Sequence, residues 1–258
     1  MDGRSGGGSG AEPALWLVVL QPTPFCNLDC AYCYLPDRAD RRRMSAQTLE
    51  AVGRNVLSSP LAAPELSVVW HAGEPMTLPP AWYDDAFARL ARAAPDKTLR
   101  HGFQTNAIGV DGAWIDLWRR WGVSVGVSLD GPAALHDARR RTRGGRGSHA
   151  PTMRGIDRLR AAGLPFHVIT VLTADSLADP DALLDFYRAH GIDHVAFNVE
   201  EEEGAHRASS LRGAAVERLH RRFLARVFAR SADAGTDPGS GLRCRETEGF
   251  RAMLAASP

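Results

Sequence analysis

The sequence has almost no lysine and no excess of charge of either sign. Lys97 is the single lysine, and the 31 basic residues face 30 acidic ones, so the formal charge is +1 with neutral histidines. A chain so nearly neutral is not expected to bind nucleic acid through its overall charge. Two glycine-containing stretches have no apolar anchor: the arginine-rich residues 139–147 and residues 231–241. We expect both to form mobile, solvated loops.

Long apolar runs are also missing. No stretch approaches the ~18 to 20 apolar residues of a membrane-spanning helix. The N-terminal MDGRSGGGSGAEPA has neither the charged start nor the apolar centre of a secretory signal. We therefore predict a disordered leader over residues 1–13, no membrane partner and a cytoplasmic protein. Hydrophobic residues at 44% and charged residues at 24% are typical of a globular protein, so a folded domain follows the leader.

Cysteine is scarce, and its placement argues against a disulfide framework. Three of the four cysteines, Cys26, Cys30 and Cys33, fall within eight residues, whereas Cys244 stands alone. Cysteines that form structural disulfides are usually spread along the chain to close loops. The cluster of three therefore indicates a site, and Cys244 is expected to be a buried or incidental thiol.

Short apolar runs alternate with segments of helical periodicity. The runs predict six strands over residues 15–20, 66–70, 99–105, 123–129, 166–172 and 194–199. The first, LWLVVL, is apolar throughout and predicts a strand buried on both faces. Six strand-helix units in series imply parallel strands joined by right-handed crossovers. We predict an α/β fold, a partial (β/α)6 TIM-type barrel over residues 14–212.

The helices between these strands have recognisable ends. Ser45 is a plausible N-cap, Gly122 ends a helix, and two helices begin at Pro151 and Pro180 and end at glycines 163 and 191. Residues 213–258 are predicted to form a C-terminal helical extension. Apolar residues recur at helical spacing in three groups: Leu49, Val52 and Val56; Trp114, Leu117, Trp118 and Trp121; and Val216, Leu219, Phe223, Val227 and Phe228.

The most informative stretch is QPTPFCNLDCAYCYLPDR, residues 21–38, directly after the first predicted strand. In a parallel barrel this position is the catalytic rim. Thiolates at the spacing Cys-x3-Cys-x2-Cys can hold three corners of a cubic iron-sulfur cluster and leave the fourth iron open. Two alternatives remain. A structural zinc site would need a fourth ligand, and a redox pair of Cys30 and Cys33 would leave Cys26 unexplained.

This triad, with Tyr32 before its third cysteine, resembles the radical S-adenosylmethionine (SAM) superfamily. The resemblance implies a partial (β/α)6 barrel in which the three cysteines bind a [4Fe-4S] cluster and SAM chelates the open iron. It also implies that the reduced cluster cleaves SAM to a 5'-deoxyadenosyl radical, which removes hydrogen from the substrate. A flavodoxin- or ferredoxin-type protein would be the reductant.

Residues at further strand ends resemble the SAM-binding motifs of this family. The segment from His71 to Pro75, HAGEP, is similar to Gly-Gly-Glu-Pro, whose backbone and carboxylate bind the SAM ammonium. Ala72 replaces the first glycine of that motif. An alanine is tolerated there only if the backbone has a conformation that is ordinary for L-residues. For the polar residues that follow, strand-end capping is the alternative to SAM binding. The cofactor contacts implied by the resemblance are Tyr32, Ala72, Gly73, Glu74, Gln104, Asn106, Ser128, Asp130, Arg140, Val171 and Leu172.

Finer similarity points to one branch of the family. The segments WHAGEP, FHVITVLT and AFNVEEEEG, with Ser209, Ser210 and Leu211, look like the cyclophane-forming maturases of glycine-rich-repeat precursors, which are related to anaerobic sulfatase-maturating enzymes. This resemblance implies a carbon-carbon crosslink in a ribosomally made precursor peptide. His71, Glu200 and Glu202 are candidate proton acceptors, with a structural histidine and a solvated acidic turn as the alternatives.

Two other functions stay open. One is oxidation of a sulfatase serine or cysteine to formylglycine, and the other is a non-catalytic iron-sulfur or zinc-binding module. Relatives commonly continue into a SPASM or twitch-like region with further cysteines, whereas this chain ends at Pro258 and Cys244 alone cannot hold a second cluster. We expect that region to be absent or truncated.

Overall fold

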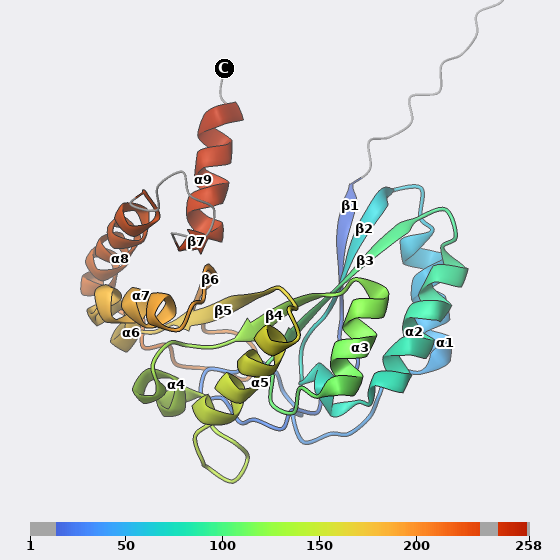
Figure 1. Ribbon diagram of the computed structural model, residues 1–258, viewed down its shortest axis with the longest axis horizontal. Coiled ribbons are helices and arrows are strands. Elements are labelled where there is room, and N and C mark those ends of the chain that lie inside the picture. Colours follow the sequence, from blue (N-terminus) through green and yellow to red (C-terminus); the bar gives the residue numbers. More distant parts are fainter. Residues whose placement is uncertain (1–13, 233–241, 257–258) are drawn as a thin grey trace, which may run out of the picture.

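The computed structural model describes residues 14–232 and 242–256, and a curved parallel sheet of seven strands forms its centre (Figure 1). The strands lie side by side in sequence order. They are β1 (Leu15–Leu20), β2 (Ala62–Trp70), β3 (Thr98–Thr105), β4 (Ser124–Ser128), β5 (Phe166–Leu172), β6 (His194–Val199) and β7 (Arg243–Cys244). The predicted α/β fold of a partial barrel is confirmed. The two-residue strand β7 was not predicted, and the leader and residues 233–241 lie outside the described residues.

Helices connect the strands and cover the outer side of the sheet (Figure 1). The α-helices are α1 (Ala46–Val52), α2 (Pro80–Ala93), α3 (Gly112–Trp121), α4 (Ala133–Arg139), α5 (His149–Ala161), α6 (Ala174–Ala178), α7 (Pro180–Ala189), α8 (Ala214–Ala232) and α9 (Arg245–Ala256), with a π-helical turn at Gly53–Leu57 and a 3-10 turn at Pro75–Thr77. In the described ranges, none is both long enough and apolar enough to cross a bilayer.

The helix ends follow the expected local chemistry, with one correction. The Ser45 side chain accepts a hydrogen bond from the Thr48 N–H, and Gly122 ends α3 in the left-handed conformation at φ 59°. The prediction that a helix begins at Pro151 is wrong by two residues, because α5 begins at His149. Pro151 still lies in the first turn, where its missing N–H needs no partner.

The core lies between the sheet and the helices and holds the strands in place. Trp70 of β2 is fully buried against Tyr83 and Phe87 of α2, with ring centroids 5.4 and 5.5 Å apart. Alternate residues of each strand point into this core, so the residues between them face the concave side. Strand pairing then places Gln104, Gly126 and His167 at one level of the concave face.

The prediction that β1 is buried on both faces is wrong. Trp16, Leu17 and Val19 are 65%, 52% and 54% exposed. In the described part of the chain β1 pairs with β2 alone, so it forms the edge of the sheet. Leu17 and Val19, which pair with Ser67 and Val69, therefore form an exposed apolar border on the concave side.

Candidate active site

The three clustered cysteines lie in the long loop between β1 and α1. This loop is held by backbone hydrogen bonds, from Cys26 N to the Arg38 carbonyl (3.1 Å) and from Cys33 N to the Cys30 carbonyl (3.1 Å). Leu28 is buried beneath it, 1% exposed. The Glu74 N–H donates to the Phe25 carbonyl at 2.8 Å, so the loop also rests on the segment that follows β2.

Gly73 permits this close approach between the two segments. A Cβ atom at Gly73 would lie 2.3 Å from the Thr23 carbonyl oxygen and 2.8 Å from that of Phe25. Both atoms belong to the backbone, so they could not move aside easily. Only glycine fits at this position with the cysteine loop in place.

The thiols of the loop are free and partly exposed. Burial, followed by the Glu74 carboxylate, raises the pKa of Cys26 to about 12. Burial also raises the pKa of Cys30, to about 11. Thiolates in such a setting need positive charge nearby to stay ionised. Cluster iron would supply that charge.

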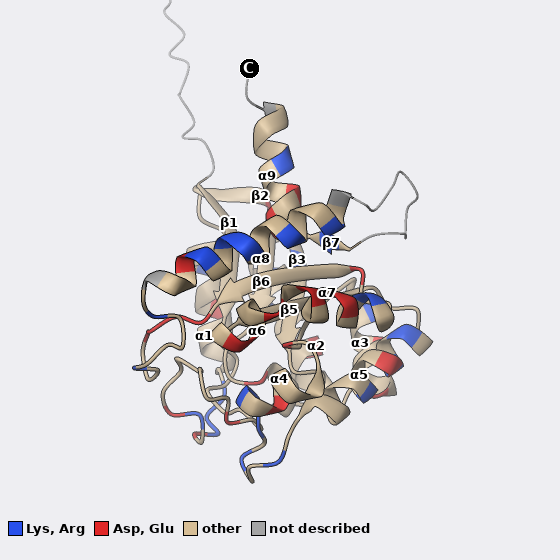
Figure 2. Ribbon diagram, turned by 90° about the vertical axis from the view of Figure 1, so that its left-hand side faces the viewer, with Lys and Arg blue, Asp and Glu red and all other residues tan. Residues whose placement is uncertain are grey.

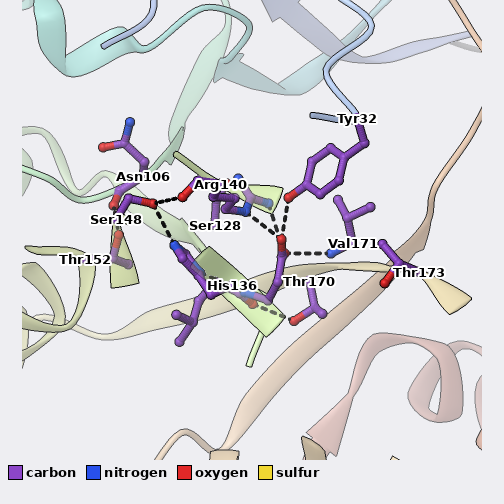
Figure 3. A network of polar contacts seen from close by, with 12 residues as sticks. Tyr32, Asn106, Ser128, His136, Arg140, Ser148, Thr152, Thr170, Val171 and Thr173 are labelled. Atoms are coloured by element: carbon purple, nitrogen blue, oxygen red, sulfur yellow. Dashed lines mark hydrogen bonds and ion pairs between the residues drawn. The ribbon is translucent and has the colours of Figure 1, made fainter. Parts of the chain in front are cut away.

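A buried network ties the loop to the end of β4 (Figure 3). Arg140 donates to both carboxylate oxygens of Asp130, Nε to Oδ2 at 2.9 Å and Nη2 to Oδ1 at 3.1 Å. The Tyr32 hydroxyl donates to the same carboxylate, as does the backbone N–H of Val171 at 3.0 Å. Burial raises the pKa of Tyr32 well above its usual value, which keeps the phenol protonated as a donor. The Asp130 carboxylate thus joins three other candidate cofactor contacts, Tyr32, Arg140 and Val171.

Glu74 joins the ends of β2 and β3. One oxygen accepts from the Thr105 hydroxyl at 2.6 Å and from Met76 N at 3.0 Å, and the other accepts from Asn106 N at 2.8 Å. Burial raises the pKa of this carboxyl, and these hydrogen bonds oppose the shift. A carboxylate has about four acceptor positions, and these donors occupy three of them.

Ala72 does not have the ordinary conformation that the sequence analysis required of it. Its φ is +70°, in the left-handed region, beside Gly73 at +66°. An L-residue in this conformation costs about 1 to 2 kcal/mol. The backbone at the predicted SAM-ammonium site is thus strained, as is often found at ligand sites.

The remaining strand-end residues differ in the face they present. Gln104 Nε2 donates to Ser128 Oγ at 2.9 Å on the concave face. Asn106 instead donates to the Asn27 side chain at 2.7 Å and so holds the cysteine loop. Leu172 is 1% exposed and packs in the core, which leaves Val171 as the residue of that pair on the concave side.

The three candidate proton acceptors lie in different surroundings. Burial, followed by the nearby Arg140, lowers the pKa of His71, so its ring is neutral at neutral pH. Glu200 is 5% exposed and accepts from the Ser210 N–H at 2.7 Å and from the Ser210 hydroxyl. Glu202 lies at the surface in an ion pair with Arg212. Both glutamates thus make these bonds within the segment 200–212.

His167 is a concave-face residue that the sequence analysis did not single out. A Cβ at Gly126 would lie 2.8 Å from His167 Nε2 and 2.2 Å from Gln104 Oε1, so both side chains reach over this glycine. Burial, followed by the charges of His194 and Arg245, lowers the pKa of His167. The alternation in FHVITVL, which puts His167 on the side of Val171, was the available signal.

The prediction of a mobile loop over residues 139–147 is wrong. Arg140 is buried, and Arg141 pairs with Gly147 in a short antiparallel bridge. Thr142 forms a second bridge, with Leu28 of the cysteine loop. Backbone hydrogen bonds, which the residue types do not reveal, anchor this hairpin in place of apolar side chains.

Comparison with known proteins identifies the family. The family model of the radical SAM superfamily matches residues 20–187, more than half of the chain. The chain belongs to the radical SAM superfamily. Membership implies a [4Fe-4S] cluster and SAM as cofactors.

Other proteins share this part of the sequence. The chain is 44% identical to an uncharacterized protein of Synechocystis sp. over 82% of its own length and 54% of that protein. It is 34% identical to the serine-type anaerobic sulfatase-maturating enzyme of Klebsiella aerogenes, over 75% of this chain and 49% of that enzyme. The chain thus spans about half the length of these relatives.

Two solved structures share the fold. The structure of anSMEcpe with bound AdoMet and the Cp18Cys peptide matches 94% of this chain and 66% of its own, with a TM-score of 0.79 and 20% identity. Streptococcus suis SuiB bound to its precursor peptide SuiA matches 84% of this chain and 47% of its own, with a TM-score of 0.60 and 20% identity.

The donor set fits the cluster that radical SAM chemistry requires. Cys26, Cys30 and Cys33 are free thiols at one end of the sheet, beside the strained Ala72–Gly73 backbone. Among the described residues, no three His, Cys, Asp or Glu side chains are close enough to share one metal ion. A cubane instead binds each thiolate to a different iron atom. Cys244, in contrast, is fully buried in β7, as expected for a thiol outside the site.

Proposed function

We propose that this radical SAM protein forms a carbon-carbon crosslink of the cyclophane type in a ribosomally made precursor peptide. The observation that carries the proposal is an open concave face beside the cysteine loop, with exposed Leu17 and Val19 at its border. Such a face suits an extended peptide. The peptide class is supported by anSMEcpe and SuiB, whose structures hold peptides. The crosslink is supported by the sequence resemblance of the segment AFNVEEEEG.

Most of the candidate residues would hold the two cofactors. Cys26, Cys30 and Cys33 would hold the cluster, and the Ala72–Gly73 backbone with Glu74 would bind the SAM ammonium. Gln104 and Ser128 would contact the ribose and carboxylate of SAM, and Val171 its adenine. Tyr32, Asp130 and Arg140 fix the loop, and Arg140 would also attract the SAM carboxylate. When bound, the cluster and SAM would supply the radical that removes hydrogen from the peptide.

The crosslink requires two hydrogens to leave the substrate. One departs as an atom from a β-carbon, and the aromatic ring that this carbon joins must then release a proton and one electron. We propose His71 as the proton acceptor, because burial keeps its ring neutral. Glu200 and Glu202 are the second choice, since their carboxylates already accept from Ser210 and Arg212. An iron-sulfur centre or an external one-electron carrier would take the electron.

Formylglycine formation is the second candidate, favoured by the 34% identity to the Klebsiella aerogenes enzyme. Mass alone does not separate the two, since serine oxidation and crosslinking each remove two hydrogens, about 2 Da. A substrate with deuterated aromatic rings separates the two reactions. Crosslinking must expel one ring deuterium and give a loss of about 3 Da, whereas formylglycine leaves the ring intact.

The test is anaerobic co-expression with a glycine-rich precursor peptide from a neighbouring gene, with deuterated aromatic residues. A loss of about 3 Da per crosslink, with fragmentation suppressed between the linked residues, is the expected result. A product lighter by about 2 Da that keeps every ring deuterium would rule out the crosslink. Absence of SAM cleavage by the reconstituted, reduced protein would favour a non-catalytic iron-sulfur or zinc module.

We also propose a cytoplasmic location. Four free cysteines suit a reducing compartment, where thiols persist. The reductant would be a flavodoxin- or ferredoxin-type protein, because SAM cleavage consumes one electron.

A further inference from the structure

The charge of the chain is unevenly distributed. Residues 37–43 and 139–147 together contain nine arginines and two aspartates, a net charge of +7. Because the whole chain has a formal charge of +1, the rest of the chain carries a net charge of −6. Arg140 is buried in the Asp130 network, but six of the other eight are exposed. We call these six the arginine surface: Arg41, Arg42, Arg43, Arg141, Arg143 and Arg146.

Two segments about one hundred residues apart meet to form this surface. Arg143 Nη1 lies 3.2 Å from the Arg38 carbonyl oxygen, and the guanidiniums of Arg41 and Arg143 both lie over the Phe25 ring, at 3.9 and 6.0 Å from its centroid. The bridge between Leu28 and Thr142 adds a backbone connection. Figure 2 shows arginine-bearing loops together at its lower end, away from α8 and α9.

The arginine surface covers the backbone of the cysteine loop. Arg143 Nη1 approaches the Cys26 carbonyl oxygen at 3.5 Å, and the neighbouring Arg38 donates to the Cys30 carbonyl at 3.3 Å. Tyr32, between Cys30 and Cys33, reaches the buried carboxylate of Asp130. Arg143 therefore places one charge of the arginine surface directly against the backbone of Cys26, one of the three cluster ligands.

Most of these charges have no carboxylate partner in the protein. In the described ranges, Arg42 pairs with Asp40, whereas Arg41, Arg43, Arg141, Arg143 and Arg146 form no ion pair. Arginines elsewhere are commonly paired, as Arg100 is with Glu65 and Arg226 with Asp181. An exposed, unpaired group of like charges raises the local potential and attracts a partner of the opposite sign.

We propose that the arginine surface is the docking site of an acidic one-electron carrier protein of the flavodoxin or ferredoxin kind. The inference rests on the radical SAM chemistry of the proposed function, which needs one electron for each SAM cleaved. That electron passes from the reduced carrier to the cluster, so the carrier is oxidised and the cluster reduced by one electron, and no bond or proton is exchanged. The carrier docks here because Arg143 of this surface contacts the backbone carbonyl of the cluster ligand Cys26.

The test is the double charge reversal Arg43→Glu with Arg146→Glu, one arginine from each segment. Oxidised flavodoxin is titrated against cluster-loaded protein at low and high salt. At about 20 mM salt the variant is expected to bind at least roughly tenfold more weakly than the wild type, and the difference should nearly vanish near 0.5 M salt, where surface charges are screened. Arg43→Lys with Arg146→Lys should bind as the wild type does.

Matched controls separate docking from damage. Arg218→Glu with Arg222→Glu reverses two exposed charges on α8, away from the loop, and should leave flavodoxin binding unchanged. Iron content should be the same in all variants, and so should SAM cleavage driven by dithionite, a small chemical reductant. SAM cleavage driven by reduced flavodoxin should fall only in the Arg43→Glu, Arg146→Glu variant.

Two results would overturn the proposal. One is wild-type flavodoxin affinity at low salt in the Arg43→Glu, Arg146→Glu protein. The other is intact flavodoxin binding with lost binding of the precursor peptide, which would assign the arginine surface to the substrate. If the crosslinking assignment fails, the flavodoxin titration is unaffected, because it contains no peptide.

Discussion

Arg140 forms a bidentate, buried ion pair with Asp130 directly beneath the cysteine loop. The side chains are 9% and 5% exposed, and the Tyr32 hydroxyl joins the same carboxylate. Asp130 thus links the cysteine loop and the start of the hairpin at residues 139–147 to the end of β4. The two residues predicted to contact SAM have a structural role in this network as well.

Asp130→Asn should lower the free energy of unfolding by about 3 to 5 kcal/mol, because the Arg140 charge would stay buried without its partner. Glu65→Gln is the matched control, since it breaks the exposed pair with Arg100 and should leave the free energy of unfolding almost unchanged. Anaerobic denaturant titrations measure both. Equal losses in the two variants would contradict a dominant role for the buried pair.

The cysteine assignment predicts which thiols hold iron. Cys26→Ala, Cys30→Ala and Cys33→Ala should each abolish the reconstituted cluster of about four irons and four sulfides, with its absorption near roughly 400 nm. Cys244→Ala should keep it, because that thiol is buried in β7. Iron and sulfide analysis decides the matter, and cluster loss in the Cys244 variant alone would refute the ligand set.

Glu74→Gln should weaken SAM binding by roughly ten-fold to over a hundred-fold, since a charge-assisted hydrogen bond contributes about 1.5 to 3 kcal/mol. Thr105→Val serves as a comparison, because it removes a donor to Glu74 but keeps the carboxylate charge, and its effect should be smaller. Equilibrium dialysis of labelled SAM against cluster-loaded protein provides the measurement. Unchanged affinity in the glutamine variant would remove Gly73 and Glu74 from the cofactor site.

Ala72→Gly should raise the free energy of unfolding by about 1 kcal/mol, because glycine adopts φ +70° without the steric cost that alanine has. Ala91→Gly, on an exposed position of α2, should instead lower it by about 1 kcal/mol. Thermal or denaturant unfolding compares the two. A loss of stability in both variants would show that Ala72 is not strained.

Stability should decrease as the pH falls from about 6.5 to 4. Burial lowers the pKa of His101 to about 4, and Trp70 donates to its neutral ring at 3.3 Å. In this pH window the unfolded chain binds a proton that the folded chain does not, which costs up to about 1.4 kcal/mol per pH unit for this group.

The variant His101→Gln keeps an acceptor for Trp70 and removes the titration. Its free energy of unfolding should therefore depend less steeply on pH between 6.5 and 5 than that of the wild type. His136, whose pKa burial also lowers to about 4, contributes to the slope that remains. Identical slopes in the two proteins would contradict a neutral His101.

Local features of the chain were readable without the structure. The spacing of Cys26, Cys30 and Cys33 predicts a cluster site because one short loop brings all three thiolates together. Apolar runs and the Gly122 and Pro180 signals predict strands and helices, since side-chain periodicity and backbone dihedrals are properties of neighbouring residues.

The tertiary structure decided what depends on distant partners. The apolar run of β1 lies exposed because its place at the sheet edge depends on which strands pair. Val171 and Leu172 alternate in any strand, but only packing against the helices determines which of them faces the core. The pairing of Asp130 with Arg140, and the meeting of two arginine segments over the cysteine loop, arise from contacts between residues far apart in sequence, which no local pattern encodes.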